Sequence, residues 1–302
     1  MTDELVKWGT CARRPKTGCV RQAVAAAEFP VGRQIRDTTF QIVKMTMRNS
    51  GRNAGLAVLL TVGFLASAEA DEAKSKEHPL TPVVRYAKLC LEKVEALPGY
   101  EATFYKREVV GRSTITQRMR LKIRHKPFSV YLYFEEPSAG REVIYVEGKN
   151  NGKLIAHEAG LLSIAGVMEL SPTDALVMKE NRYPITKAGI ANTLRIMITE
   201  WEKEMKYGET EVKTFNNAKL GNLKCRVIET SHPRPRRQFN NHKIRLWVDA
   251  SSGFPVRMQK YGFPRKAGEP APIIEEYTFM NLKTDVRLSD ADFDRNNSKY
   301  SF

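Results

Sequence analysis

The chain has 302 residues, 49 Lys or Arg against 34 Asp or Glu, and a formal net charge of +15; 42% of it is hydrophobic and only 4 residues are Cys. A chain of this length can bury a sizeable core without disulfides, and this composition excludes a disordered or collagen-like protein. No apolar run reaches the roughly 20 residues that cross a bilayer. The excess of cations is typical of nucleic-acid binding, but that interpretation depends on the compartment.

An export signal is predicted inside the chain, at residues 47–70. Two arginines precede the apolar run 54–66, and a small-x-small cleavage site ends at Ala70. This order is that of a secretory signal peptide. Met47 is then the true initiator, and residues 1–46 are an upstream mis-start or a disordered tail. Two alternatives are a cytoplasmic tail before an uncleaved anchor and a buried core helix.

Export changes the interpretation of the charge. Cleavage near Ala70 removes ten cations and five carboxylates, which leaves a mature chain with a net charge of +10. In the periplasm or outside the cell, the expected anionic partners are phospholipid head groups or other envelope polymers, and nucleic acid is not expected. No Cys follows the apolar run of the signal. We therefore expect a protein without a lipid anchor.

The first half of the mature chain is predicted to be a helix followed by a meander of strands. After a charged spacer at 71–79, apolar residues repeat at helical spacing over 83–97, and Pro98-Gly99 ends the run. The period then changes to two, which is typical of strands with one buried face. The predicted strands are 100–110, 118–126, 128–136, 141–148 and 153–158.

The second half repeats this order after an irregular apolar stretch at 159–182. A second helix is predicted from Pro184 to Gly208, and five more strands follow at 211–217, 224–231, 242–249, 255–262 and 272–283. The fold class is therefore α+β: one large curved antiparallel sheet of about ten strands, an open half-barrel, with two main helices against its concave face. It occupies residues 80–302 as a single domain.

Three segments carry a resemblance to a known family: ENRYPITKAGI at 180–190, LWVDASSGFPVRMQKYG at 246–262 and LSDADFDRNNSKYSF at 288–302. Together with the predicted architecture, they resemble an exported bacterial family of unknown function that is similar in fold to the lipoprotein carriers LolA and LolB. The resemblance covers residues 80–302. It implies a half-barrel closed by helices around an apolar cavity, and it supplies no ligand.

Catalytic and metal-binding motifs are not found in the sequence. The five histidines lie far apart and no C-x-x-C or G-x-S-x-G occurs, so neither a metal, a cofactor nor an enzymatic activity is expected. The aspartates of DADFDRNN partly match a calcium loop, but Arg295 stands where glycine is needed. Ser289 is better interpreted as the cap of a short helix. Cys90 and Cys225 could form a disulfide or remain two buried thiols.

Two groups of residues are candidates for binding. The first would line a lipid-sized cavity, unless it is an ordinary packed core: Ile190, Leu194, Met197, Trp201, Met205, Leu162, Ile164 and Met168. The second is a basic docking loop, which could equally be a solvated hairpin loop: Arg234, Arg236, Arg237 and Lys243.

The sequence thus favours an exported, soluble binding protein that holds a lipid, an acyl chain or a lipidated ligand non-covalently. An anionic membrane surface is a further expected contact of the basic loop. The alternative is an envelope scaffold or protein-interaction domain with a solid core. A cavity in the folded protein distinguishes the two hypotheses.

Overall fold

The computed structural model describes residues 77–266 and 268–302. The predicted upstream segment 1–46, the signal peptide 47–70 and most of the spacer 71–79 lie outside the described residues. The described residues are those of the predicted half-barrel domain, together with the end of the spacer.

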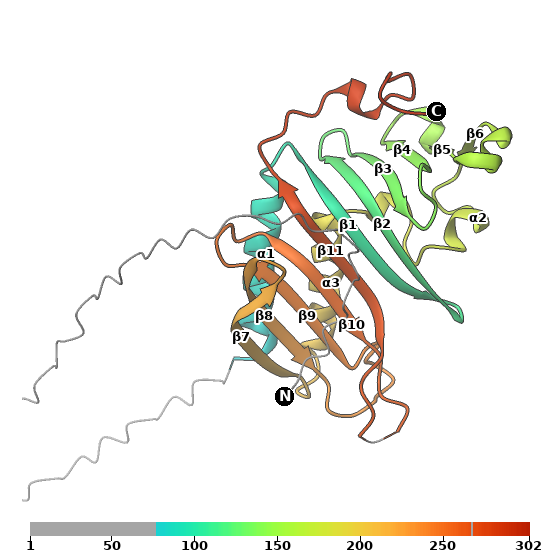
Figure 1. Ribbon diagram of the computed structural model, residues 1–302. Helices are drawn as coiled ribbons and strands as arrows, with labels where there is room; N and C mark the ends of the chain where they lie inside the picture. Colours follow the sequence, from blue (N-terminus) through green and yellow to red (C-terminus); the bar gives the residue numbers. More distant parts are fainter. Residues whose placement is uncertain (1–76, 267) are drawn as a thin grey trace, which may run out of the picture. The chain divides into compact units, whose positions relative to one another are not determined.

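One antiparallel sheet of eleven strands forms the framework, in the order β6-β5-β4-β3-β2-β1-β11-β10-β9-β8-β7 (Figure 1). Neighbours in this order are also neighbours in sequence, except that β1 pairs with β11. The strands are β1 (Gly99–Val110), β2 (Ser113–Arg124), β3 (Ser129–Glu136), β4 (Glu142–Val146), β5 (Leu154–His157), β6 (Val167–Leu170), β7 (Glu211–Leu220), β8 (Leu223–Ser231), β9 (Lys243–Asp249), β10 (Pro255–Tyr261) and β11 (Ile273–Lys283).

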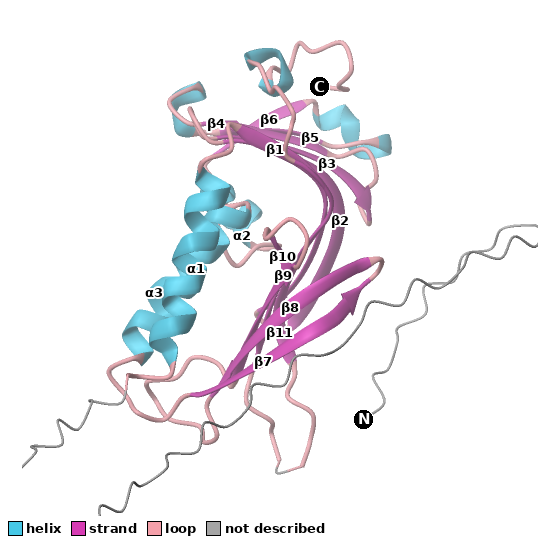
Figure 2. Cartoon of the chain, turned by 90° about the vertical axis from the view of Figure 1, so that its left-hand side faces the viewer, coloured by secondary structure: helices cyan, strands magenta, loops and turns pink. Residues whose placement is uncertain are grey.

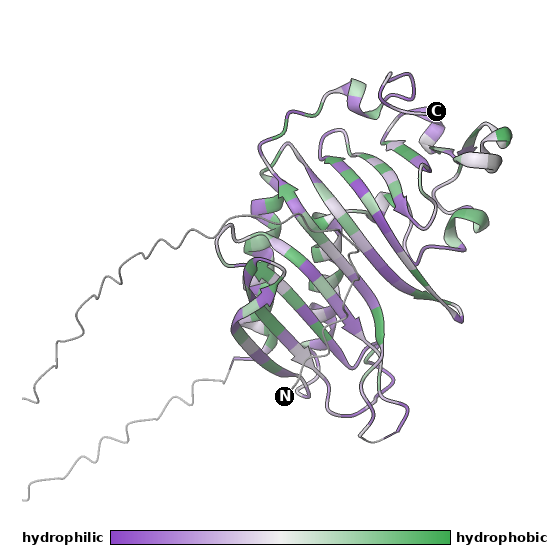
Figure 3. Ribbon diagram, in the orientation of Figure 1, coloured by the Kyte–Doolittle hydropathy of each residue, from purple (hydrophilic) through white to green (hydrophobic). Residues whose placement is uncertain are grey.

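The strands follow the alternation of their sequences. In β2, Met119, Leu121 and Ile123 are buried, while Arg120 between them is exposed. Hydrophobic and hydrophilic residues alternate in the same way along the neighbouring strands (Figure 3). Because successive side chains point to opposite faces, this pattern gives the sheet an apolar concave face.

Two long helices lie side by side against that concave face (Figure 2). They are α1 (Leu80–Glu95) and α3 (Ile190–Glu204). The short helices are η1 (Asn150–Gly152), η2 (Gly160–Ala165), α2 (Ala175–Met178), η3 (Ile185–Lys187) and η4 (Asp290–Phe293). The predicted α+β half-barrel, with two main helices on its concave side, is confirmed.

The sheet has one strand more than the ten predicted. The additional strand, β6, lies in the stretch 159–182, which was predicted to be irregular. It pairs with β5, where Ile155 lies opposite Glu169. Four residues contain only two full alternations, which is too short for a periodic signal.

The second long helix begins six residues later than predicted. Pro184 precedes the separate turn η3, and Gly189 then adopts a φ of +92° before α3 starts. A Cβ at Gly189 would stand 2.8 Å from the Tyr100 hydroxyl, which itself accepts a hydrogen bond from the Ile190 amide at 2.8 Å. Glycine is therefore required there by both backbone conformation and space.

The C-terminal segment covers the convex face of β2 to β4. Tyr300 stacks on Tyr131 with ring centroids 4.1 Å apart, and Lys122 Nζ lies 2.8 Å from Asp292 Oδ1. The Ser289 amide donates to Asp292 Oδ2 at 2.9 Å, which forms the start of η4. The predicted cap of a short helix at Ser289 is confirmed.

Cys90 and Cys225 are both buried, free thiols. Cys90 belongs to the core between the helices and the concave face. On β8, Arg226 points to that side because its guanidinium lies over the Tyr86 ring of α1, so the neighbouring Cys225 points to the convex side. The sheet separates the two sulfurs. Of the two alternatives for the cysteines, a disulfide or two buried thiols, the structure shows two buried thiols.

Candidate binding site

A cavity of about 220 Å³ lies between the concave face of the sheet and the irregular segment that precedes α3. We call residues 171–189, which contain α2 and η3, the strap. Strands β1 to β6, β10 and β11, the strap and the first turns of α3 all contribute residues to the cavity lining. The apolar lining residues include Phe104, Met119, Leu132, Phe134, Val143, Leu154, Ala156, Met168, Leu170, Leu176, Val177, Ile185, Ile196 and Met258.

The cavity exists because the strap covers the sheet irregularly. Where α1 and α3 cover it, side chains of helix and sheet interlock, and the second crevice between α3 and β9–β10 has a volume of only about 10 Å³. The four-residue α2 and the single turn η3 offer no continuous row of side chains for such packing. The space beneath the strap is therefore left open.

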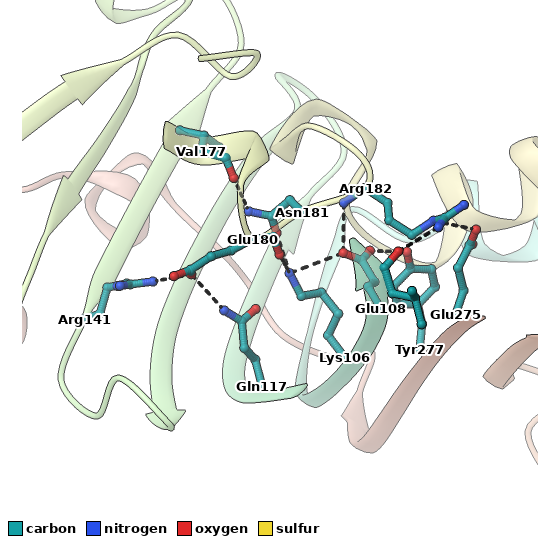
Figure 4. Close-up of polar contacts among 11 residues, drawn as sticks. Lys106, Glu108, Gln117, Arg141, Val177, Glu180, Asn181, Arg182, Glu275 and Tyr277 are labelled. Atoms are coloured by element: carbon teal, nitrogen blue, oxygen red, sulfur yellow. Dashed lines mark hydrogen bonds and ion pairs between the residues drawn. The ribbon is translucent and has the colours of Figure 1, made fainter. Parts of the chain in front are cut away.

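Polar side chains hold the strap to the sheet at one side of the cavity (Figure 4). The Lys106 ammonium donates to the Glu180 carbonyl oxygen at 3.0 Å and to the Asn181 side-chain oxygen, and it lies 3.6 Å from Glu108 Oε2. Lys106 is only 6% exposed. Burial lowers the pKa of Lys106, and the neighbouring Glu108 and Glu180 act in the opposite direction.

Glu180 connects the strap to β2 and to Arg141, the residue that precedes β4. Its Oε2 accepts from Arg141 Nη1 at 2.9 Å and from Gln117 Nε2 at 3.3 Å. The Arg141 guanidinium also pairs with Glu158, with Nε and Oε1 2.6 Å apart. Burial acts to lower the pKa of Arg141, but the two carboxylates more than offset it and raise that pKa.

A second cluster holds the strap through the next two residues, Arg182 and Tyr183. Glu275 accepts a hydrogen bond from the Tyr183 hydroxyl at 3.2 Å and pairs with Arg182 at 3.0 Å and Lys260 at 3.5 Å. Lys260 also contacts Glu200 of α3 at 2.8 Å. Burial acts to lower the pKa of Lys260, but these carboxylates raise it overall, so the ammonium stays charged.

Glu108 completes this polar side. Its carboxylate accepts from the Arg182 amide at 2.9 Å and from the Tyr277 hydroxyl. Burial, followed by the Glu108 charge, raises the pKa of Tyr277, which keeps the phenol a donor. The site thus combines an apolar hollow with a buried, mutually paired set of charges, and this suits non-covalent binding of an apolar group.

Seven of the eight predicted cavity residues have described side chains, and these lie in three different environments. Met168 lines the cavity. Ile190, Leu194, Met197 and Trp201 are at most 2% exposed in the core between α3 and the sheet, and Met205 is half-buried at the end of that helix. Ile164 is 88% exposed. The Leu162 side chain lies outside the described part of the chain.

The sequence predicted that one face of α3 lines the cavity. In the structure, that face packs against the other half of the sheet. Trp201 Nε1, for example, donates to Thr230 Oγ1 of β8 at 3.0 Å. The helix reaches the cavity through a different edge, with Thr193 and Ile196. The amphipathic pattern identifies a buried face, but it does not say whether that face meets a cavity or a solid core.

Sequence reasoning missed the charged residues of the site, although a signal for them exists. On β1, Lys106 and Glu108 continue the inward series begun by Tyr100 and Phe104, and on β11 Glu275 shares a face with Tyr277. A charge on the apolar face of a strand must be paired, so it marks a special site. The alternation of the sequence could have revealed it.

The four residues of the predicted basic loop lie in two different parts of the fold. Arg234, Arg236 and Arg237 are exposed in the connection between β8 and β9. Lys243 instead lies in β9, where its ammonium is 3.6 Å from Glu229 and over the Tyr261 ring. Lys243 therefore belongs to the surface of the sheet and is not part of a docking loop.

Residues 77–266 and 268–302 contain no group of three or more His, Cys, Asp or Glu side chains placed to hold a metal ion. None of the helices in this same part of the chain combines the length and hydropathy needed to span a bilayer.

The chain belongs to the DUF1571 family, described as a protein family of unknown function, whose profile matches residues 97–302. The predicted membership in a family of unknown function is thereby confirmed. No curated protein matches the chain.

Several solved structures are similar to the chain. Lipoprotein LppX of Mycobacterium tuberculosis shares 9% identity over 69% of this chain and 98% of its own, with a TM-score of 0.39. LprF of Mycobacterium bovis shares 10% identity over 70% and 98%, with a TM-score of 0.39. A LolA superfamily protein of Nitrosomonas europaea shares 15% identity over 69% and 97%, with a TM-score of 0.28.

Proposed function

We propose that this protein binds a lipid or a single acyl chain non-covalently in the cavity beneath the strap. The observation that carries the proposal is the cavity itself: about 220 Å³, with apolar walls from seven strands on one side and from the strap on the other. Cavities of roughly 150 Å³ with comparable walls bind benzene, whereas drug-sized ligands occupy roughly 300–1,000 Å³. The volume suits one chain.

The composition of the walls supports an apolar occupant. Met119, Met168 and Met258 contribute flexible, polarizable side chains that adapt to irregular shapes. The charges at the polar side are paired with each other, so they need no ionic ligand. A scaffold with a solid interior, the alternative function, receives no support from this cavity.

The proposal is tested by mass spectrometry and by filling the cavity. Native mass spectrometry of the protein, incubated with lipid vesicles and repurified without detergent, should show an added lipid mass. The variant Ala156→Phe places a ring into the cavity from β5. It should weaken binding of an apolar dye such as N-phenyl-1-naphthylamine by at least tenfold, with little change in the thermal midpoint.

Ile155→Phe is the matched control, because residue 155 lies on the same strand and points to the opposite face. Dye binding by this control should equal that of the wild type. Absence of bound lipid in the wild type, or equal dye binding by Ala156→Phe and the wild type, would contradict the proposal.

We also propose that the protein works outside the cytoplasm after cleavage near Ala70. This rests on the order of charges, apolar run and small residues at 47–70. N-terminal sequencing of the protein from the envelope fraction tests it directly. A mature end near Asp71 is expected, and an intact end at residue 1 or 47 would refute cleavage.

A further inference from the structure

The connections β8–β9 and β10–β11 lie at the same end of the sheet, at the bottom of Figure 1. They leave it side by side because β9 pairs with both β8 and β10. The His242 amide donates to the Tyr261 carbonyl oxygen at 2.8 Å, and the rings of His242 and Phe263 are 5.3 Å apart. Residues distant in sequence thus form one surface.

This surface is strongly basic. The first connection contributes Arg234, Arg236 and Arg237, and the second contributes Arg265 and Lys266; all five are exposed. We call these five residues the basic tip. Within the described residues of the two connections the only carboxylate is Glu269, and Glu209 of the neighbouring α3–β7 connection pairs with Arg236 at 2.9 Å.

The base of the tip is firmly packed although its cations are exposed. His232, 1% exposed, stacks on Phe239 with ring centroids 3.7 Å apart, and its Nε2 lies 3.2 Å from Glu204 Oε1. The ring of Tyr207, which is 39% exposed, meets Phe239 edge to face. The cations are therefore presented from a fixed platform rather than from an unanchored loop.

We propose that the basic tip docks on the surface of an anionic lipid bilayer. Both connections extend past the ends of the strands at the same end of the sheet, which suits a flat partner. Each Lys or Arg held near such a surface contributes about 1 kcal/mol. Exposed Tyr207 adds an amphipathic ring of the kind found at membrane interfaces. Among the described residues only Arg236 of the five has an ion-pair partner, so the other four cations are available to anionic head groups.

The proposal is tested by sedimentation of the protein with vesicles. We compare vesicles of phosphatidylcholine alone with vesicles of equal parts phosphatidylcholine and phosphatidylglycerol. The wild type should bind only the anionic vesicles, and salt near 1 M, where the Debye length falls to about 3 Å, should release it. This binding does not depend on the cavity, and Ala156→Phe should leave it unchanged.

The triple variant Arg234→Glu, Arg237→Glu, Arg265→Glu should reduce the partition coefficient at low salt by at least about 100-fold, since three contributions of about 1 kcal/mol are lost. The control is Lys219→Glu, Lys224→Glu, Lys283→Glu, which changes the net charge equally at positions of the opposite end of the sheet. It should lose no more than about 3-fold.

Three outcomes would overturn the proposal: no binding of the wild type to anionic vesicles, as expected if the tip contacts an acidic protein instead; unchanged binding of the tip variant; or equal losses in both triple variants. Circular dichroism confirms that the variants are folded. Should the triple variant not fold, Arg234→Gln with Arg237→Gln must still lower binding by about 30-fold.

Discussion

The two halves of the sheet have the same alternating strands but different covers. Over β8 to β10, the helix α3 packs Trp201 and Leu194 against Ile244 and Leu246, and the space left is about 10 Å³. Over β1 to β5 the cover is the strap, and the space left is about 220 Å³. The regularity of the covering segment, rather than the composition of the sheet, decides whether a concave face becomes a core or a cavity.

The halves also differ in how polar groups hold the cover. In the solid half, the contact is mainly apolar: α3 adds one hydrogen bond from Trp201 to Thr230 and one ion pair between Glu200 and Lys260. In the cavity half, the strap is held to the sheet by partly buried ion pairs such as Arg182 with Glu275. Such pairs contribute little net stability, but breaking one of them leaves an uncompensated charge. These ion pairs therefore fix where the strap lies more than they increase the free energy of unfolding.

The largest expected effect on stability comes from creating a cavity in the solid half. Trp201→Ala should lower the free energy of unfolding by about 3–5 kcal/mol, because Trp201 is fully buried and its neighbours cannot collapse into the space. Met168→Ala, in the cavity wall, should cost only about 1 kcal/mol, because Met168 is half-buried against an existing hollow. Urea unfolding measures both, and equal losses would contradict the comparison.

The next effect concerns the buried charges beneath the strap. Glu275→Gln should cost about 2–4 kcal/mol in urea unfolding, because it leaves Lys260 and Arg182 without a carboxylate that both contact. Glu276→Gln is the control on the same strand: Glu276 is half-buried on the other face, and its change should cost less than about 1 kcal/mol. A loss from Glu276→Gln as large as that from Glu275→Gln would refute the role assigned to the buried cluster.

A local effect is expected where Glu180 holds the strap. Glu180→Ala removes the hydrogen bonds to Arg141 and Gln117, so amide exchange over 171–183 should accelerate about tenfold, with little change in global stability. Glu169→Ala, which removes only the exposed pair with Arg295 at 3.9 Å, is the control. Exchange that rises throughout the sheet would show that the strap does not open independently.

The smallest expected effect on stability concerns the turn between β9 and β10 in the solid half. Burial acts to raise the pKa of Asp249, but hydrogen bonds from Ser251 and Ser252 more than offset it and lower that pKa. A lowered pKa gives stability that is present above the unfolded value of about 3.9 and is lost as pH falls through the folded value. Asp249→Asn should therefore cost about 1–2 kcal/mol at pH 7 and almost nothing in strong acid.

Thermal unfolding from pH 7 down to acid measures this difference. Asp285→Asn is the control, because Asp285 is exposed and should show no such dependence. A constant difference between wild type and Asp249→Asn over the whole range would contradict the assignment.

Much of the fold is explained by local patterns. Alternation in segments such as that of Met119 to Ile123 predicted ten of the eleven strands, and turns such as Ser251-Ser252-Gly253 separated them. β6 was missed because four residues carry too little periodicity. The first turn of the second helix was misplaced because Gly189, whose φ is positive, ends one turn before another begins.

The candidate site was less predictable. Of the predicted lining residues whose side chains are described, Met168 alone reaches the cavity, because helical periodicity identifies the buried face of α3 without identifying what that face meets. The charges at Lys106, Glu108 and Glu275 were visible as interruptions of apolar strand faces. Their partners in the strap could not be found, since the contacts join residues more than 70 positions apart.

The sequence by itself therefore determined the strands, the two long helices, the antiparallel half-barrel and the family, because each depends on side-chain periodicity or on short segments of sequence. Only the tertiary structure decided where the cavity lies, that Cys90 and Cys225 are separated by the sheet, and that two connections join into one basic tip. Periodicity fixes the face to which a side chain points, whereas the packing of distant segments fixes what it meets there.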